Sequence, residues 1–302
     1  MIIALTGATG FVGQATVEAL LAAGHELRAL TRRPQPPGAV EWVEGDLADH
    51  LALERLVRGA EAVIHIAGVV NAPDVQGFEE GNVRGTLELV EAAVAARVPR
   101  FLFISSLAAR EPHLSAYGDS KARAERIMAA SGLDWTIVRP PAIYGPHDRE
   151  MFELFRAACW GVVPVPPKGG RVSIIHVDDL ARLLVALLPE NEATSHRIYE
   201  VDDGRKGGRS HRELARAIGR AVGRRVWVPH LSRATLDRLA RLDGWWRKTA
   251  AKLTPDRVSY MTHPDWVADP ARHAPADLWR PQISAAEGLK ATAQWYREAG
   301  WL

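Results

Sequence analysis

The fold is decided by the stretch IIALTGATGFVG, residues 2–13, near the start of the 302-residue chain. A short apolar run leads into three glycines spaced GxxGxxG and then into apolar residues at helical intervals, which is the pattern of a strand, a turn and a helix. Gly7 allows a tight turn, Gly10 allows a phosphate group to approach the backbone, and Gly13 allows the helix to pack closely on the strand. The stretch therefore predicts a dinucleotide-binding turn, whereas an ordinary strand-to-helix turn would not need this spacing.

The start of the predicted helix supplies hydrogen-bond donors for an anion. The first backbone N–H groups of a helix have no partner within the helix, and here they fall near Phe11 and Val12. A pyrophosphate beside the glycines would accept hydrogen bonds from these groups. The predicted cofactor-binding residues of the turn are Gly7, Thr9, Gly10, Phe11 and Val12.

Composition bounds the class of protein. The chain is 47% hydrophobic and 25% charged, which is typical of a globular protein with one large core or a core plus a smaller lobe. A formal net charge of +2 gives no reason to expect nucleic acid as a partner. No apolar stretch approaches the length of a membrane span, and no basic and apolar leader precedes the first strand. We therefore expect a cytoplasmic protein without a membrane partner.

The chain has a single cysteine, Cys159. One cysteine excludes an internal disulfide and any multi-cysteine metal site, and we expect no metal. Because Cys159 stands in an apolar setting beside Trp160, we expect its side chain to be packed.

Strands and helices alternate along the first half of the chain. Beyond the first strand at 2–5, apolar runs predict strands at 25–30, 40–43, 62–66, 100–104 and 135–138. Amphipathic segments predict further helices at 50–57, 78–96 and 116–130. This alternation predicts an α/β fold, a Rossmann-type doubly wound parallel sheet covered on both faces. Ligands of such sheets bind beyond the carboxyl ends of the strands.

Two arginines follow the second predicted strand, where an NAD-selective protein usually has a carboxylate for the ribose hydroxyls. A guanidinium binds a 2′-phosphate through paired, charge-assisted hydrogen bonds. Arg32 and Arg33 therefore favour NADP over NAD. NAD stays open, because Pro34, Pro36 and Pro37 are also typical of an exposed turn in which both arginines are only solvated.

Residues after two further strands are also expected to contact the cofactor. The third strand leads into Gly45-Asp46-Leu47, which places Asp46 and Leu47 near the adenine. The fourth ends in Ile66, Ala67 and Gly68, where small residues let the cofactor pass over the sheet edge. His65, just before them, is interpreted as a hydrogen-bonded strand residue and not as a catalyst.

The candidate chemistry follows the fifth strand. Ser105 and Ser106 come directly after this strand, and Tyr117 opens the sequence YGDSK with Lys121 four positions later. Residues four apart share a helix face, so the phenol and the ammonium project together toward the sheet edge. A tyrosine is a poor base at neutral pH, and a nearby cation stabilises its phenolate form. A serine hydroxyl would hold the substrate oxygen while the tyrosine gives or takes a proton, and Lys121 would also bind the nicotinamide ribose.

The chain resembles the extended short-chain dehydrogenase/reductase family, which includes NAD-dependent epimerases and dehydratases and enzymes like 3β-hydroxysteroid dehydrogenase. The resemblance covers nearly all of the chain, because eight motifs occur in the family's order and spacing: TGATGFVG, GDL, VIHIAG, GNVRGTLELVEAA, FISSLAA, YGDSK, VRPPAIYGP and IIHVDDLA. It implies an enzyme with a nicotinamide cofactor and a small-molecule substrate. Relatives often pair through two long helices, so a homodimer through the helices predicted at 78–96 and 116–130 stays open.

The resemblance also implies roles for individual residues. Ser106, Tyr117 and Lys121 would be the catalytic serine, tyrosine and lysine. Ser105 is the alternative for the serine, since the doublet leaves a one-residue ambiguity, and it is also expected beside the cofactor. Asn82 would support the cofactor site from its helix. The residues expected to flank the nicotinamide are Pro140, Pro141 and Ile143.

The regular alternation weakens after about residue 145. A further strand is predicted at 172–177 and is expected to return to the sheet with the helix that follows it. The predicted cofactor domain therefore comprises residues 1–145 and about 170–200, and a smaller substrate-binding lobe comprises about 146–169 and 201–302. Seven of the ten tryptophans follow residue 201, and they either form an apolar substrate pocket or fill a small core. Ser284 and Glu287 have capping-box spacing at the start of a predicted C-terminal helix.

Three functions fit these patterns. The favoured one is an NADP-dependent oxidoreductase that transfers a hydride between the nicotinamide and a carbonyl or alcohol substrate. The arginine pair argues against the second, a nucleotide-sugar epimerase or dehydratase that holds NAD tightly and returns the hydride within one cycle. The intact Ser106, Tyr117 and Lys121 argue against the third, a non-catalytic cofactor-binding protein such as a redox sensor or a complex I accessory subunit.

Overall fold

A computed structural model describes residues 1–72, 74–247 and 253–302 of the chain. These residues form two compact units. The first unit comprises Met1–Arg139, Asp178–Glu200 and Arg272–Arg280, and the second comprises Pro140–Val177, Val201–Ala271 and Pro281–Leu302.

The first unit is built on a seven-stranded parallel sheet with the order β10-β6-β5-β4-β1-β2-β3. Its strands are β1 (Ile2–Thr6), β2 (Glu26–Thr31), β3 (Val40–Glu44), β4 (Ala62–His65), β5 (Arg100–Ile104), β6 (Asp134–Arg139) and β10 (Arg197–Glu200). The order confirms the predicted Rossmann-type class, and the six predicted strands are confirmed to within one residue at each end. Chain order reverses between β1 and β4, which is where ligands bind in open sheets of this kind.

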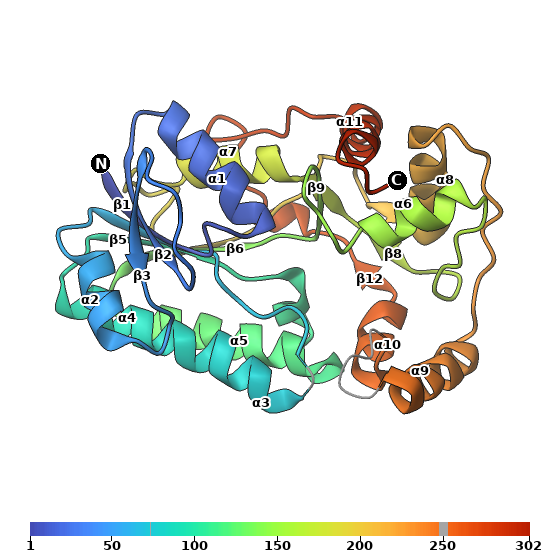
Figure 1. Cartoon of the computed structure of the whole chain (residues 1–302), viewed down its shortest axis with the longest axis horizontal. Helices are drawn as coiled ribbons and strands as arrows, with labels where there is room; N and C mark the ends of the chain where they lie inside the picture. The colour runs from blue at the N-terminus through green and yellow to red at the C-terminus, as the bar shows by residue number, and fades with distance from the viewer. Residues whose placement is uncertain (73, 248–252) are drawn as a thin grey trace. The chain divides into compact units, whose positions relative to one another are not determined.

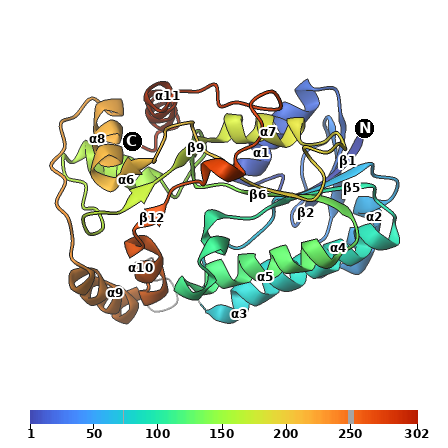
Figure 2. The same cartoon turned by 180° about the vertical axis from the view of Figure 1, so that it is seen from behind.

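Helices cover both faces of this sheet (Figures 1 and 2). On one face lie α1 (Phe11–Ala22) and α7 (Val177–Ala186); on the other lie α2 (His50–Val57), α4 (Gly85–Ala95) and α5 (Ala116–Ala130). Buried strand residues such as Val63, Phe101 and Ile137 form one core with Leu56 of α2 and Met128 of α5. This continuous core fixes the strand ends, and therefore the residues that follow them, in a rigid frame.

The predicted helix at 78–96 is interrupted. The structure has a short helix α3 (Val75–Phe78), a π-helical turn η1 (Glu79–Arg84) and only then α4. The wider π turn carries Asn82, whose side chain is buried and bonded to backbone outside the helix. Single π turns inside α-helices are frequent at functional sites.

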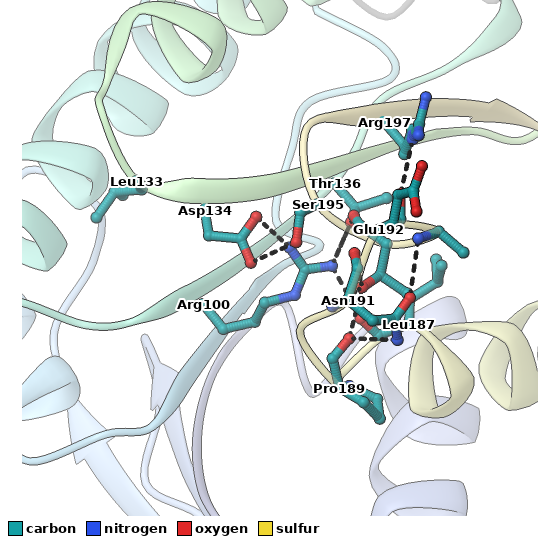
Figure 3. A network of polar contacts seen from close by, with 12 residues as sticks. Arg100, Leu133, Asp134, Thr136, Leu187, Pro189, Asn191, Glu192, Ser195 and Arg197 are labelled. Atoms are coloured by element: carbon teal, nitrogen blue, oxygen red, sulfur yellow. Dashed lines mark hydrogen bonds and ion pairs between the residues drawn. The ribbon is translucent and has the colours of Figure 1, made fainter.

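A buried arginine fixes the edge of the sheet where β10 joins it (Figure 3). Arg100 of β5 is 2% exposed and forms an ion pair with Asp134 of β6 at 3.3 Å. Its guanidinium also donates to the carbonyl oxygens of Leu187 and Thr194 at 2.9 and 3.1 Å. These bonds hold the connection from α7 to β10 against the sheet. The sequence did not predict β10, whose four residues RIYE carry charges at both ends.

The second unit has two small sheets. In one, β7 (Ala142–Tyr144) pairs with β9 (Ile174–His176); in the other, β8 (Arg171–Val172) lies between β11 (Arg209–Ser210) and β12 (Asp265–Trp266). The strand predicted at 172–177 is therefore wrong in two respects: it is two short strands, and neither belongs to the seven-stranded sheet. Residues 140–145 and 170–177, expected in the cofactor domain, lie in this unit because β7 and β9 pair with each other.

The helices of the second unit are α6 (Phe152–Cys159), α8 (His211–Ala221), α9 (Arg233–Arg247), α10 (Pro255–Thr262) and α11 (Ala285–Glu298). Ser284 caps α11 by accepting the Glu287 N–H, so the predicted start of this helix is confirmed. Tyr296 is fully buried, and its ring stacks on Trp301. Packing thus accounts for this part of the tryptophan-rich region.

The expected packing of Cys159 is wrong. The cysteine is exposed at the end of α6, and the ring of the adjacent Trp160 is 85% exposed. An apolar neighbour in the sequence therefore did not indicate a buried position.

Candidate active site

The glycine turn between β1 and α1 packs closely on the backbone around it and leaves the start of α1 exposed and, in the described part of the chain, uncapped. Gly7 has φ +77°, and a Cβ on it would lie 2.7 Å from the backbone nitrogen of Ala67. A Cβ on Gly13 would collide with the carbonyl oxygen of Gly7. Gly10 is the exposed N-cap of α1, and no described side chain caps this helix end. The turn therefore fits a dinucleotide phosphate held by the first N–H groups of α1.

The loop after β2 is ordered by one threonine. The Thr31 hydroxyl donates to the carbonyl oxygen of Arg33 at 2.7 Å and accepts the Arg33 N–H at 3.3 Å. Arg32 and Arg33 are both exposed, so their guanidinium groups can reach a ligand. The backbone of this loop is fixed and the two side chains are solvated. This arrangement fits a phosphate-binding loop and also fits an exposed turn without a ligand.

Asp46 and Leu47 follow β3. The Asp46 carboxylate is exposed and accepts the Ala48 N–H at 2.9 Å. This bond closes a short turn before α2. Leu47 is partly buried and packs against the core of the sheet.

His65 at the end of β4 is held in one tautomer. Thr86 donates its hydroxyl to the Asn82 carbonyl oxygen, so it must accept from His65 Nε2 at 3.0 Å. His65 Nδ1 then accepts from the Thr6 hydroxyl, which in turn accepts the Ala67 N–H. Burial lowers the pKa of His65 to about 3, so the ring stays neutral. The interpretation of His65 as a hydrogen-bonded strand residue agrees with this geometry.

Asn82 connects the end of β4 to α5. Its Oδ1 accepts the Val69 N–H at 2.7 Å, and its Nδ2 donates to the Val69 carbonyl oxygen and to Ser120. A Cβ on Gly68 would lie 3.1 Å from Asn82 Oδ1 and 3.7 Å from Lys121 Nζ. Gly68, which follows Ile66 and Ala67 at the end of β4, thus lies beside both side chains, and its lack of a side chain allows this close approach.

Lys121 is buried at the carboxyl end of β5. Its Nζ donates to the Ile104 carbonyl oxygen at 2.7 Å and lies 4.4 Å above the Phe103 ring. Burial lowers the pKa of Lys121 to about 8, against a smaller raising effect from the Glu125 charge. The group is therefore mainly cationic at neutral pH and has a fixed position.

The two serines after β5 differ in what their hydroxyls do. Ser105 donates its hydroxyl to Glu125, so its hydrogen points into the protein. Ser106 is the N-cap of the short helix η2 (Leu107–Arg110), where its oxygen accepts the Ala108 N–H at 3.1 Å. Among the described residues, none accepts the Ser106 hydroxyl hydrogen. Ser106 is the better donor for a substrate oxygen.

Tyr117 stands in the first turn of α5. Ser115 caps this helix by accepting the Gly118 N–H, and the Tyr117 ring lies 6.1 Å from the Phe78 ring. A Cβ on Gly118 would lie 2.8 Å from the Ala108 carbonyl oxygen. Gly118 therefore allows the first turn of α5 to pack directly on η2, the element that begins at Ser106.

A buried ion network supports the second half of α5, at Glu125, and was not predicted from the sequence. Arg139 of β6 binds both carboxylate oxygens of Glu125, at 2.9 and 2.6 Å. Glu200 of β10, which is fully buried, pairs with Arg139 at 3.5 Å and with Arg110 at 3.3 Å. The network links two strands, β6 and β10, and two helices, α5 and η2, to the Ser105 hydroxyl. Glu125 stands four residues after Lys121 on the same helix face, and this spacing was the signal available in the sequence.

The first unit thus contains all the predicted site residues from Gly7 to Lys121. Pro140, Pro141 and Ile143 belong to the second unit, where Ile143 lies in β7 opposite Ile175 of β9. Their expected role beside the nicotinamide stays a prediction. Within the described residues there is no cluster of three or more His, Cys, Asp or Glu side chains that could hold a metal ion.

The sheet order, the glycine turn and the tyrosine and lysine on α5 together define an enzyme of the extended short-chain dehydrogenase/reductase class, with a nicotinamide cofactor. The chain belongs to the NAD dependent epimerase/dehydratase family, whose model matches residues 3–202.

Relatives of the chain include both reductases and epimerases. Ceramide reductase of Caulobacter vibrioides is 38% identical, over all of this chain and 96% of its own. The 2-alkyl-3-oxoalkanoate reductase of Stenotrophomonas maltophilia is 27% identical, over 96% of this chain and 98% of its own. Among solved structures, MoeE5 in complex with UDP-glucose and NAD is 25% identical, with a TM-score of 0.77 and coverage of 99% of both chains. These comparisons support a nicotinamide cofactor and an oxidoreductase or epimerase.

Proposed function

We propose that the protein is an NADPH-dependent reductase that reduces the carbonyl group of a substrate with long alkyl chains. The observation that carries the chemistry is the position of Lys121, a buried cation fixed on the carbonyl of Ile104 and on the same helix face as Tyr117. The substrate class rests on two relatives named as reductases, one for ceramide and one for 2-alkyl-3-oxoalkanoates, because both compounds carry alkyl chains.

The proposed mechanism divides the reaction between cofactor and side chains. A bound nicotinamide cofactor would supply the hydride for the carbonyl carbon. The Ser106 hydroxyl donates a hydrogen bond to the carbonyl oxygen and orients it. Tyr117 transfers its phenolic proton to this oxygen as negative charge develops there, so the product is an alcohol. Lys121 stabilises the resulting phenolate because an opposite charge close by favours the ionised form.

The preference for NADPH is proposed to depend on Arg32 and Arg33. Each is expected to form charge-assisted hydrogen bonds with the 2′-phosphate. The double substitution Arg32→Ala/Arg33→Ala should weaken NADPH binding by about 10- to 100-fold, since hydrogen bonds to charged groups contribute roughly 1.5–3 kcal/mol. NADH affinity should stay within about twofold. Equal losses for both nucleotides in a fluorescence titration would show that these arginines do not read the 2′-phosphate.

The cofactor cycle distinguishes this proposal from a nucleotide-sugar epimerase. The purified protein is first examined by mass spectrometry for a retained nucleotide and then titrated with NADPH and NADH. An empty site that prefers NADPH, followed by oxidation of NADPH with a long-chain ketone, would support the reductase. Retained NAD with no net NADPH oxidation would favour the epimerase, a reading also compatible with the fold shared with MoeE5.

A further inference from the structure

Helix α9 in the second unit exposes large apolar side chains. Its inner side packs on α10, where Leu236 and Ala240 form a small buried cluster with Val258. Its other residues include Leu239, Leu242, Trp245 and Trp246, whose exposed fractions are 41%, 61%, 74% and 81%. Single exposed apolar residues are ordinary, but four within eight positions of one helix form a patch.

These four residues share one side of the helix. Leu239, Leu242 and Trp246 have the spacing i, i+3, i+7, which brings them onto one stripe, and Trp245 borders it. We call these four residues the α9 stripe. The face that packs on α10 is formed by Leu236 and Ala240, and Leu239 borders this face. The other three residues of the stripe lie farther round the helix and are more exposed.

The α9 stripe has arginines around it. The helix carries four arginines and two aspartates. Asp237 pairs with Arg233, and Asp243 pairs with Arg247. Arg238 and Arg241 are exposed and form no ion pair within the described part of the chain, so the helix presents positive charge beside the stripe.

We propose that the α9 stripe docks on the surface of an anionic phospholipid membrane, with α9 lying in the plane of the headgroups. Leucine and tryptophan side chains would enter the boundary between headgroups and acyl chains, and Arg238 and Arg241 would contact lipid phosphates. Tryptophan and arginine suit this position because each has an apolar body and a polar end. An anionic bilayer supplies both an apolar layer for the stripe and negative charge along the whole helix for the two arginines.

Peripheral docking of this kind is compatible with the absence of a membrane span. In the described ranges, no helix has both the length and the apolar character needed to cross a bilayer. The expectation of no membrane partner came from that absence, and a helix lying on the surface needs no span. The inference rests on the proposed function in one respect: a substrate with long alkyl chains resides in a membrane, so docking would bring the enzyme to it.

The test measures binding of the full chain to phosphatidylcholine vesicles with and without about 30% phosphatidylglycerol, by co-sedimentation. We expect binding to the anionic vesicles that weakens with salt. The triple substitution Leu242→Ser/Trp245→Ser/Trp246→Ser should reduce binding at least tenfold. Leu51→Ser removes a 70% exposed leucine from α2 and is the matched control that should bind normally.

The charge contribution has its own pair of variants. Arg238→Glu/Arg241→Glu should reduce binding to anionic vesicles about tenfold or more, since each basic residue near such a surface contributes roughly 1 kcal/mol. Arg216→Glu/Arg220→Glu on α8 changes the net charge equally, at two exposed positions without a neighbouring apolar stripe. Equal losses in both pairs would show attraction by overall charge alone and would overturn the proposal.

Contact is located with brominated phosphatidylcholine, which quenches only tryptophans that reach the acyl chains. Quenching should disappear in Trp245→Ser/Trp246→Ser and persist in Trp160→Ser. Quenching that disappears only in Trp160→Ser would place the contact elsewhere. A wild-type dimer that the triple substitution converts to a monomer in light scattering, without vesicles, would show that the stripe joins two copies, and would overturn the proposal.

Vesicle binding tests the docking proposal, and reductase activity tests the proposed function, so either proposal can be overturned without the other. Binding without any NADPH-dependent ketone reduction would retain the docking and remove the proposed function. Reduction of a long-chain ketone without vesicle binding would do the reverse.

Discussion

Helices α5 and α9 are both fifteen residues long, yet they distribute their side chains in opposite ways. Helix α5 buries an ammonium and a carboxylate, those of Lys121 and Glu125. Helix α9 buries only Leu236 and Ala240 and exposes its remaining leucines and both tryptophans. Each helix departs from the rule that apolar groups are inside and charges outside, and such departures are expected where a chain has functional demands.

The departure in α5 is stable because each buried polar group has a partner. Lys121 donates to the Ile104 carbonyl oxygen, and Glu125 accepts from Arg139 and Ser105. The exposed apolar groups of α9 are not covered in this way: the α9 stripe is 41% to 81% exposed, and the ring centroids of Trp245 and Trp246 lie 6.3 Å apart. The buried charges of α5 are therefore paired within the protein, whereas the apolar groups of the α9 stripe are open to a binding partner.

The largest effect is expected from Tyr117→Phe in α5. Removal of the phenolic proton donor should lower kcat for carbonyl reduction about a thousandfold, within the range for loss of a general acid. The ring is retained, so NADPH affinity should change less than about twofold. Stopped-flow turnover and fluorescence titration measure the two quantities. A variant that loses cofactor binding instead would show that Tyr117 is not the proton donor.

Matched amide substitutions compare the ion pairs of the two helices. Glu125→Gln removes the charge that Arg139 binds at a site with side chains 8% and 13% exposed. Breaking a buried pair leaves a charge poorly compensated, so we expect about 3 kcal/mol of destabilisation. Asp237→Asn in α9 breaks the exposed pair with Arg233 and should change stability by less than about 0.5 kcal/mol. Urea unfolding measures both, and equal effects would contradict the distinction between the helices.

The sequence predicted the sheet and the site residues because both depend on local patterns. Apolar runs gave six strands, and glycine spacing and the YGDSK motif gave α1 and the candidate tyrosine and lysine. The hydroxyl of Ser105 could not be assigned from sequence, because its partner Glu125 lies twenty residues away and is oriented by β6. Non-local pairing likewise decided that residues 172–177 lie outside the main sheet, because β8 pairs with β11 and β12, and β9 pairs with β7.

The exposed apolar residues of α9 could not be predicted from sequence periodicity either. No helix was predicted at 233–247, and apolar residues at helical spacing do not in any case show which positions another element covers. Helix α10 covers Leu236 and Ala240 and leaves the α9 stripe outside. The same limit applied to Cys159, whose apolar setting beside Trp160 suggested a packed side chain although both residues are exposed.

Two leucines six positions apart in α9 test this division within one helix. Leu236 is 5% exposed and Leu242 is 61% exposed. Leu236→Ala should cost about 2 kcal/mol, at the lower end for a buried leucine because the cluster is small. Leu242→Ala should change stability by less than about 0.5 kcal/mol. Thermal unfolding measures the stability of both variants, and hydrogen exchange of α10 reports the local effect. A large loss of stability in Leu242→Ala would mean that the stripe is covered in solution.

The smallest expected effect is a shift in a pH profile. Burial lowers the pKa of Lys121 to about 8, and the Glu125 charge opposes this lowering. A lysine loses its charge as pH rises through its pKa, so kcat/KM for reduction should fall as pH rises through about 8. Glu125→Gln removes the opposing charge, which lowers the pKa of Lys121 further and moves the fall to lower pH. Asp237→Asn in α9 should leave the profile unchanged. If the Glu125→Gln profile keeps its wild-type midpoint, a group other than Lys121 controls the reaction at alkaline pH, and the burial of charge in α5 then has a structural role alone.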